Sequence, residues 1–163
     1  MPPAELNADD FRNAMSRFAT GVTIVTTNDP GGRPVGFTAS AFSSLSLNPP
    51  LVLVCLDRRA ECFEAFQATD LMAINILAMG QDDIAMRFAT RGADKFGATR
   101  TTAGTATGTP LIDGALAQVE CRVHERVEGG DHVILVGEVV CAASDDSEPL
   151  LHYNRNFGRF QAS

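Results

Sequence analysis

Short runs of β-branched and large apolar residues, separated by clusters of turn-forming residues, limit what this chain can fold into more than any other feature. Residues 22–27 are all β-branched, and residues 51–56 form an unbroken apolar run. Such runs favour strands, whereas the turn-forming residues at 28–32 and 128–131 favour tight connections. The runs recur in pairs suited to hairpins and do not alternate regularly with helices. We therefore expect a mainly β fold, a closed or split antiparallel barrel, instead of a doubly wound parallel sheet.

The remaining segments complete this pattern. We expect further strands at residues 35–46, 71–77, 116–127 and 133–142, and short helices at residues 9–18, 61–68 and 82–88.

Four of these segments lead to specific expectations. Residues 21–46 are expected to form one hairpin, and the strand at 51–56 to be buried on both faces. Residues 97–110 have almost no large side chain and are expected to form the most mobile loop. The tail at 149–160 has enough apolar residues to dock on the body. The length of 163 residues fits one domain, residues 1–163.

The first helix has one apolar face. Asp9 or Asp10 can cap it, and Phe11, Met15 and Phe18 follow at spacings of four and three. These spacings place all three side chains on the same side of a helix.

Charge and composition narrow the partners. The formal net charge is −7, and Lys and Arg form no basic stripe, so nucleic acid and anionic membrane surfaces are not expected partners. No apolar run reaches membrane-span length, and the acidic start does not resemble a secretion signal. The four cysteines form no CxxC pair and are interpreted as reduced core residues. These features favour a cytoplasmic location.

The common catalytic motifs are missing from the sequence. The three histidines share no metal-ligand spacing, no serine lies in GxSxG, and neither GxGxxG nor a P-loop occurs. We expect no metal and no catalytic side chain. The chain is then either a binding module or a protein whose cofactor supplies the chemistry.

Three segments favour a cofactor. Small and hydroxylated residues at 36–44 would let a planar ring approach the backbone, and the hydroxyls of Thr38 and Ser40 could pair with its polar edge. Arg58 and Arg59 stand before a predicted helix and could bind a phosphate. A tight turn presents His132 at the start of a strand. Each segment has a plain alternative as a polar strand face, a solvated charge run or a surface histidine.

Taken in order, these segments resemble the flavin reductase-like family, which includes the small reductase components of two-component aromatic monooxygenases. The similarity covers residues 9–160, and the matching stretches are 11–15, 17–27, 36–46, 48–54, 74–77, 88–89, 94–96, 130–132, 149–151 and Tyr153.

The resemblance implies an FMN-binding split barrel of Greek-key type that works as a homodimer. It also implies an NAD(P)H:flavin oxidoreductase that transfers a hydride from NADH, or NADPH, to FMN or FAD. The reduced flavin would pass to a separate monooxygenase. The residues expected at the cofactors are Thr38, Ala39, Ser40 and Ala41 for the flavin ring; Cys55, Leu56 and Asp57 for the ring and ribityl chain; Arg59, Ala60 and Glu61 near the phosphate; Phe88 and Arg91 beside the flavin; and His132 and Tyr153 near the nicotinamide.

This chain departs from the family pattern at residues 57–61. Many relatives offer neutral hydroxyls to the phosphate there, whereas Glu61 would repel a phosphate and Arg59 would attract it. Two further functions stay open. One is a protein that uses tightly bound flavin to reduce another acceptor, such as a corrin or ferric complex, or that binds flavin without turnover. The other is a flavin-free interaction module.

Overall fold

The computed structural model describes Met1 and residues 5–163, and its fold is mainly β. Within these residues the helices are α1 (Ala8–Met15), α2 (Phe63–Ala68) and α3 (Asp82–Ala89). The strands are β1 (Thr20–Gly21), β2 (Thr23–Asn28), β3 (Pro34–Ala39), β4 (Phe42–Leu47), β5 (Pro50–Asp57), β6 (Leu71–Ile76), β7 (Thr101–Ala103), β8 (Pro110–Ile112), β9 (Ala117–Gly129), β10 (His132–Ser144), β11 (Leu150–Tyr153) and β12 (Asn156–Arg159). The expected fold class is confirmed.

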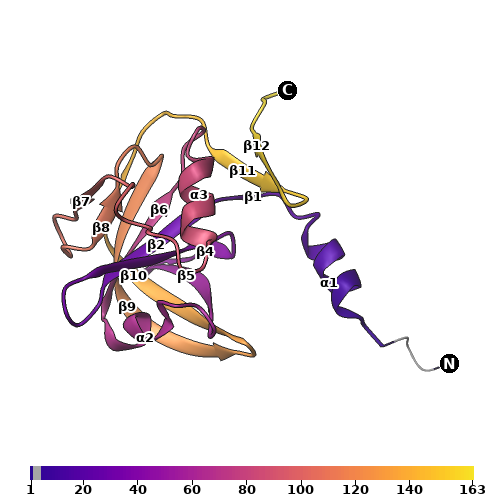
Figure 1. The fold of residues 1–163 in the computed structure, drawn as a ribbon, viewed down its shortest axis with the longest axis horizontal. Helices are drawn as coiled ribbons and strands as arrows, with labels where there is room; N and C mark the ends of the chain where they lie inside the picture. Colours follow the sequence, from indigo (N-terminus) through magenta and orange to yellow (C-terminus); the bar gives the residue numbers. More distant parts are fainter. Residues whose placement is uncertain (2–4) are drawn as a thin grey trace.

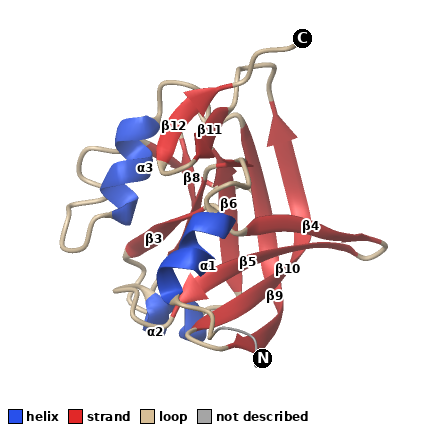
Figure 2. Ribbon diagram, turned by 90° about the vertical axis from the view of Figure 1, so that its right-hand side faces the viewer, coloured by secondary structure: helices blue, strands red, loops and turns tan. Residues whose placement is uncertain are grey.

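A seven-stranded antiparallel sheet forms the body, with strand order β3-β2-β6-β9-β10-β5-β4 (Figure 2). The two edge strands, β3 and β4, are joined by only Ser40 and Ala41. The chain thus crosses from one edge of the sheet to the other, and the Cys55 backbone N–H donates to the Ala41 carbonyl at 3.1 Å. This crossing closes the sheet into a barrel. The expected hairpin over 21–46 is therefore correct only for β2 and β3, because β4 pairs with β5.

The predicted strands at 116–127 and 133–142 are confirmed as β9 and β10, which pair as a long hairpin. Gly130 lies in the two-residue turn between them with a φ of +74°. That backbone conformation favours glycine, which explains the turn signal in the sequence. The turn brings His132 to the barrel end where β5 finishes, because His132 pairs with Asp57.

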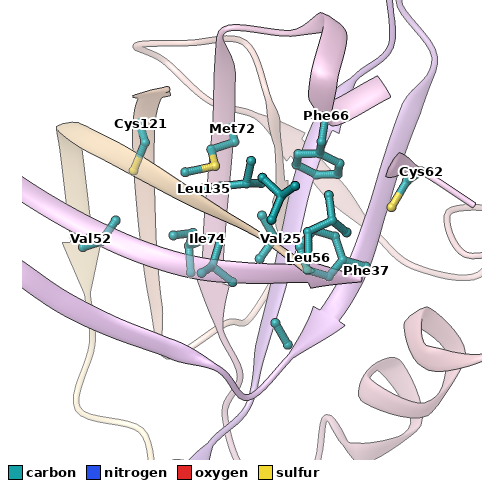
Figure 3. Close-up of a cluster of buried hydrophobic side chains, with 13 residues drawn as sticks. Val25, Phe37, Val52, Leu56, Cys62, Phe66, Met72, Ile74, Cys121 and Leu135 are labelled. Atoms are coloured by element: carbon teal, nitrogen blue, oxygen red, sulfur yellow. The ribbon is translucent and has the colours of Figure 1, made fainter. Parts of the chain in front are cut away.

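The main core lies inside the barrel. Figure 3 shows Val25, Phe37, Leu56 and Phe66 converging from three strands and α2, and the Phe37 and Phe66 rings meet edge to face with centroids 5.2 Å apart. In β5, Val52, Val54 and Leu56 are buried, but the residues between them are only half-buried. The expectation that β5 is buried on both faces is therefore wrong.

A second core cluster lies between the sheet and α3. Val22, Ile24, Leu77, Phe88 and Leu150 are among its buried members. Leu150 belongs to β11, which pairs with β1, so the start of the tail docks as expected. The rest of the tail is different, because Phe157 and Phe160 are exposed.

Helix α1 extends away from the barrel (Figure 1). Its cap is Asn7, whose side chain accepts a hydrogen bond from the Asp10 backbone N–H, so the expected caps Asp9 and Asp10 are wrong. No residue of α1 is buried. The helix ends at Met15, so the expected extension to Phe18 is wrong. Phe11 and Met15 on its apolar face, and Phe18 beyond its end, keep more than half of their surface accessible.

The segment at 97–110 is held by the body. β7 and β8 pair with each other, and Glu120 of β9 is only 2% exposed. Its carboxylate accepts hydrogen bonds from the backbone N–H groups of Ala106 (3.1 Å) and Thr107 (2.7 Å) and from the Thr107 hydroxyl (2.7 Å). The small residues that suggested a mobile loop fit around this buried carboxylate, because a Cβ at Gly104 would lie 2.3 Å from it.

The four cysteines are free thiols. Cys62 and Cys121 are buried and Cys55 and Cys141 half-buried, so the core interpretation is correct for two of them. Burial raises the pKa of Cys62 to about 11 and that of Cys121 to about 12. Within the described residues, none of the helices is both long and apolar enough to span a membrane.

Candidate functional site

A cavity of about 880 Å³ lies at one end of the barrel, between β3, the end of β5 and the segment that follows α3. Its size is typical of a site for a small ligand. Ten of the sequence-predicted site residues line it: Thr38, Cys55, Leu56, Asp57, Arg59, Ala60, Glu61, Phe88, Arg91 and His132. The structure thus gathers residues from four distant segments around one space.

Close approach of α3 to β3 forms one wall of the cavity. A Cβ at Gly36 would lie 2.7 Å from the Val25 carbonyl oxygen and 3.1 Å from the Phe88 ring, so only glycine lets Phe88 pack here. The Thr38 hydroxyl donates to the Ala85 carbonyl of α3 at 2.6 Å. It ties the same two elements together, and its lone pairs are left as acceptors toward the cavity. The wall combines a small polar group with the largely covered ring of Phe88, which is 2% exposed.

Asp57 and Arg59 form a bidentate ion pair at the cavity. The Asp57 carboxylate accepts from Arg59 Nη2 at 2.9 Å, Nε at 3.2 Å and the backbone N–H at 2.8 Å. The Arg59 side chain is the main cause that lowers the pKa of Asp57 to about 2. This guanidinium was expected to face a phosphate, yet it is already engaged. Arg58 binds the Gly130 carbonyl and the Glu128 carboxylate instead.

Glu61 anchors the segment after α3. Its carboxylate accepts from the Gly92 backbone N–H at 3.0 Å and from Lys95 Nζ at 3.2 Å, and Arg91 Nε lies at 4.0 Å. The Gly92 hydrogen bond, followed by that of Lys95, lowers the pKa of Glu61. A backbone N–H and two cations therefore converge on one anionic group at the cavity.

His132 lies across the strand pair from Asp57 at the cavity edge. Its Nδ1 is 2.7 Å from an Asp131 carboxylate oxygen, and this hydrogen bond is the main cause that lowers the pKa of Asp131. The neighbouring carboxylate orients the ring with one nitrogen held. The other nitrogen, Nε2, is left to contact a ligand.

Four predicted residues lie elsewhere. Ala39 is packed in the main core, and Ser40 lines a second cavity of about 330 Å³ that also includes Thr20 and Phe42. The Ala41 carbonyl accepts the Cys55 backbone hydrogen bond that extends the β4–β5 pairing. Tyr153 lies half-exposed on β11. The described chain does not bring these four into the larger cavity.

Sequence reasoning missed several residues of the cavity, above all Gly92 and Lys95. Lys95 lies in one of the stretches that match the family, and its position directly before the second-core residue Phe96 gives no sign of its partner. The Phe88 and Phe96 rings pack edge to face with centroids 5.1 Å apart. This contact folds the segment between them back and delivers Lys95 to Glu61.

The lining of the cavity suits a flavin nucleotide. Its aromatic wall fits a planar ring, and the convergence of Gly92 N–H, Lys95 and Arg91 fits an anion. In Met1 and residues 5–163, no three His, Cys, Asp or Glu side chains gather into a possible metal site.

The fold and the site define a flavin reductase-like protein. The model of the flavin reductase like domain matches residues 15–161, and the chain belongs to this family.

The chain is similar over most of its length to several known proteins and to a solved structure. The chain is 47% identical over 148 residues to the actinorhodin polyketide dimerase of Streptomyces coelicolor, over 90% of this chain and 83% of that protein. It is 41% identical over 158 residues to the FMN reductase (NADH) SmoA of Agrobacterium fabrum, over 97% and 89% of the two chains. It is 42% identical over 155 residues to the reductase component of a 4-nitrophenol 4-monooxygenase/4-nitrocatechol 2-monooxygenase of Rhodococcus opacus, over 95% and 82%.

The solved structure is that of the Streptomyces globisporus NADH:FAD oxidoreductase in complex with NAD and FAD fragments. It superposes with a TM-score of 0.89 at 39% identity, over 97% of this chain and 98% of that one.

Proposed function

We propose that the protein is an NADH-dependent flavin reductase that transfers a hydride from NADH to FMN or FAD and supplies reduced flavin to a separate monooxygenase. The observation that carries the proposal is the cavity itself, which joins an aromatic wall, a cationic end and His132 in a chain of this family. The relatives named FMN reductase (NADH) and reductase component support it. The functional unit in this proposal is a single domain, residues 1–163.

The residues of the cavity bind and orient in this proposal. A bound flavin supplies a ring that accepts hydride from the nicotinamide of NADH. Phe88 and Thr38 hold the ring plane against β3, and the segment from Arg91 to Lys95 binds the phosphate end. His132, fixed by Asp131, orients the nicotinamide. The gain in rate comes from alignment of two ligands, not from a protein nucleophile.

The proposal includes a homodimer. α1 presents Phe11 and Met15 to solvent, and Phe18 is exposed just beyond it. The edge strand β4 exposes Leu45 and Leu47 beside the projecting β4–β5 turn (Figure 2). A second copy of the chain would cover these side chains. Sedimentation equilibrium tests this: Met15→Asp together with Leu47→Asp should give a monomer, and a monomeric unmodified chain would contradict the dimer.

We also propose a cytoplasmic location. The four free thiols, of which Cys55 and Cys141 are half-buried, suit a reducing compartment.

The decisive experiment follows NADH loss at 340 nm while FMN, FAD and riboflavin are added in turn. A colourless protein that oxidises NADH only with added flavin supports the proposal. A protein that is yellow as purified and does not respond to added flavin would favour a tightly bound flavin with another acceptor. No oxidation and no flavin binding would remove the proposed function.

A further inference from the structure

At the cationic end of the cavity, a backbone N–H and a lysine bind an anionic side chain of the protein itself. The Gly92 backbone N–H and Lys95 Nζ both point at the Glu61 carboxylate, at 3.0 and 3.2 Å. Gly92 has a φ of +73°, a backbone conformation that favours glycine. A carboxylate held by this N–H and by Lys95 has the charge and the acceptor oxygens that a phosphate also offers.

The pairing of charges around the cavity gives the Glu61 position a particular importance for anion binding. Each of the four cations that line it faces a carboxylate: Arg33 faces Asp29, Arg59 faces Asp57, and Arg91 and Lys95 share Glu61. The Arg33 and Arg59 pairs are local, each closed within a turn of the chain. Glu61 alone holds two cations, so its departure frees both at once.

Glu61 can leave its site more easily than a buried carboxylate. Its side chain is 42% exposed, whereas that of Lys95 is 16% exposed and therefore fixed. Lys95 also donates to the Thr90 carbonyl at 3.1 Å, which keeps it in place without Glu61. The site would thus persist when the carboxylate swings into solvent.

We propose that Glu61 is a specificity-determining residue that occupies the phosphate position of the flavin site and must be displaced by the phosphate of FMN or FAD. This inference rests on the proposed function, since it takes flavin nucleotides as the ligands. Displacement weakens the binding of phosphorylated flavins but not of riboflavin, which has no phosphate. Competition between the Glu61 carboxylate and the phosphate makes reduced FMN or FAD easier to release.

The test compares dissociation constants for FMN and riboflavin, measured by quenching of flavin fluorescence. Glu61→Gln keeps an oxygen for Gly92 but loses the charge, and we expect FMN to bind about threefold to tenfold more tightly, a range typical of one partly exposed charge. Riboflavin affinity should stay within about twofold of its starting value by the same reasoning. Lys95→Met should weaken FMN and spare riboflavin. Glu64→Gln, the same change on the exposed side of α2, is the matched control.

Equal effects of Glu61→Gln on FMN and riboflavin, or weaker FMN binding, would overturn the proposal. A second arm does not depend on flavin: calorimetric titration with inorganic pyrophosphate should show tighter binding to Glu61→Gln than to the unmodified protein. Loss of NADH oxidation and of all flavin binding in the unmodified protein would remove the proposed function, while the pyrophosphate arm would still decide whether Glu61 fills an anion site.

Discussion

Two glutamates of this protein make similar contacts in opposite surroundings. Glu61 and Glu120 each accept hydrogen bonds from backbone N–H groups of a glycine-containing segment. Glu120 is almost fully buried and its three donors are neutral. Glu61 lies at a cavity and its partners include Lys95, with Arg91 nearby.

The difference shows how burial decides the role of an identical side chain. Breaking the Glu120 contacts would leave buried donors without partners, which is costly. Breaking the Glu61 contacts returns a partly exposed carboxylate to water, which costs less, and Lys95 keeps the Thr90 carbonyl as a partner. Glu120 is therefore expected to act on stability, and Glu61 on ligand binding.

The largest effect is expected for Glu120→Ala. Three donors at Ala106 and Thr107 would lose their acceptor, and the free energy of unfolding should fall by about 3–4 kcal/mol. Urea unfolding measures this, with exposed Glu125→Ala on the same strand as the control. A loss no greater than that of the control would show that Glu120 and Glu61 do not differ as described.

The pH dependence of stability should reveal the burial of the Cys121 thiol, which follows Glu120 in β9. The pKa of Cys121 is about 12, raised from an ordinary 9.0 mainly by burial. Above pH 9 the unfolded state loses this proton while the folded state keeps it, so stability should fall with rising pH. The expected slope is about 1.4 kcal/mol per pH unit for one thiol. Cys62 contributes a slope of its own over this range, because its pKa is raised to about 11. Cys121→Ala should therefore reduce the slope between pH 9 and 11 without removing it, and an unchanged slope would contradict the buried thiol.

Substitutions at two glycines should distinguish the Glu120 region from the cavity, because only one of them should change flavin binding. Gly104→Ala would press a Cβ on Glu120, and Gly36→Ala would press one on the Val25 carbonyl and Phe88. Each should cost about 1–3 kcal/mol of stability. Only Gly36→Ala should also weaken flavin binding, which fluorescence quenching measures. Gly158→Ala, with open space around its Cβ, is the control. Equal flavin affinities of the Gly36→Ala and Gly104→Ala variants would contradict the distinction between the cavity and the Glu120 region.

The smallest effect is expected for His132→Ala. The exposed pair with Asp131 supports no loop, so stability should not change measurably. The Michaelis constant for NADH should rise by about threefold to tenfold, as for one lost hydrogen bond, and more than that for flavin. Steady-state kinetics at 340 nm gives both constants. An unaltered constant for NADH would remove His132 from the nicotinamide site.

Local sequence signals predict much of the barrel but not its long-range contacts. The β-branched and apolar runs identify β2, β6, β9 and β10, because those side chains favour strands wherever they pair. The bend at Ser40 and Ala41 is invisible locally, since it depends on which edge β4 joins. The segment at 97–110 looks mobile until Glu120 supplies its acceptor from another strand.

The site follows the same division. Thr38 of β3, the end of β5 and the start of β10 are predicted together by the resemblance to the family, and they line one cavity. The ion pairs inside this cavity are not predicted. The charges in the sequence do not show that Arg59 turns back to bind Asp57 or that Lys95 binds Glu61. Those pairs change which group can meet a phosphate.

A crystal soaked with FMN would test the central claim most directly. We expect density for the flavin ring against Gly36, Thr38 and Phe88, with its phosphate near Gly92 and Lys95 and the Glu61 side chain moved aside. Density for the ring at any other place, with these residues unchanged, would contradict the account.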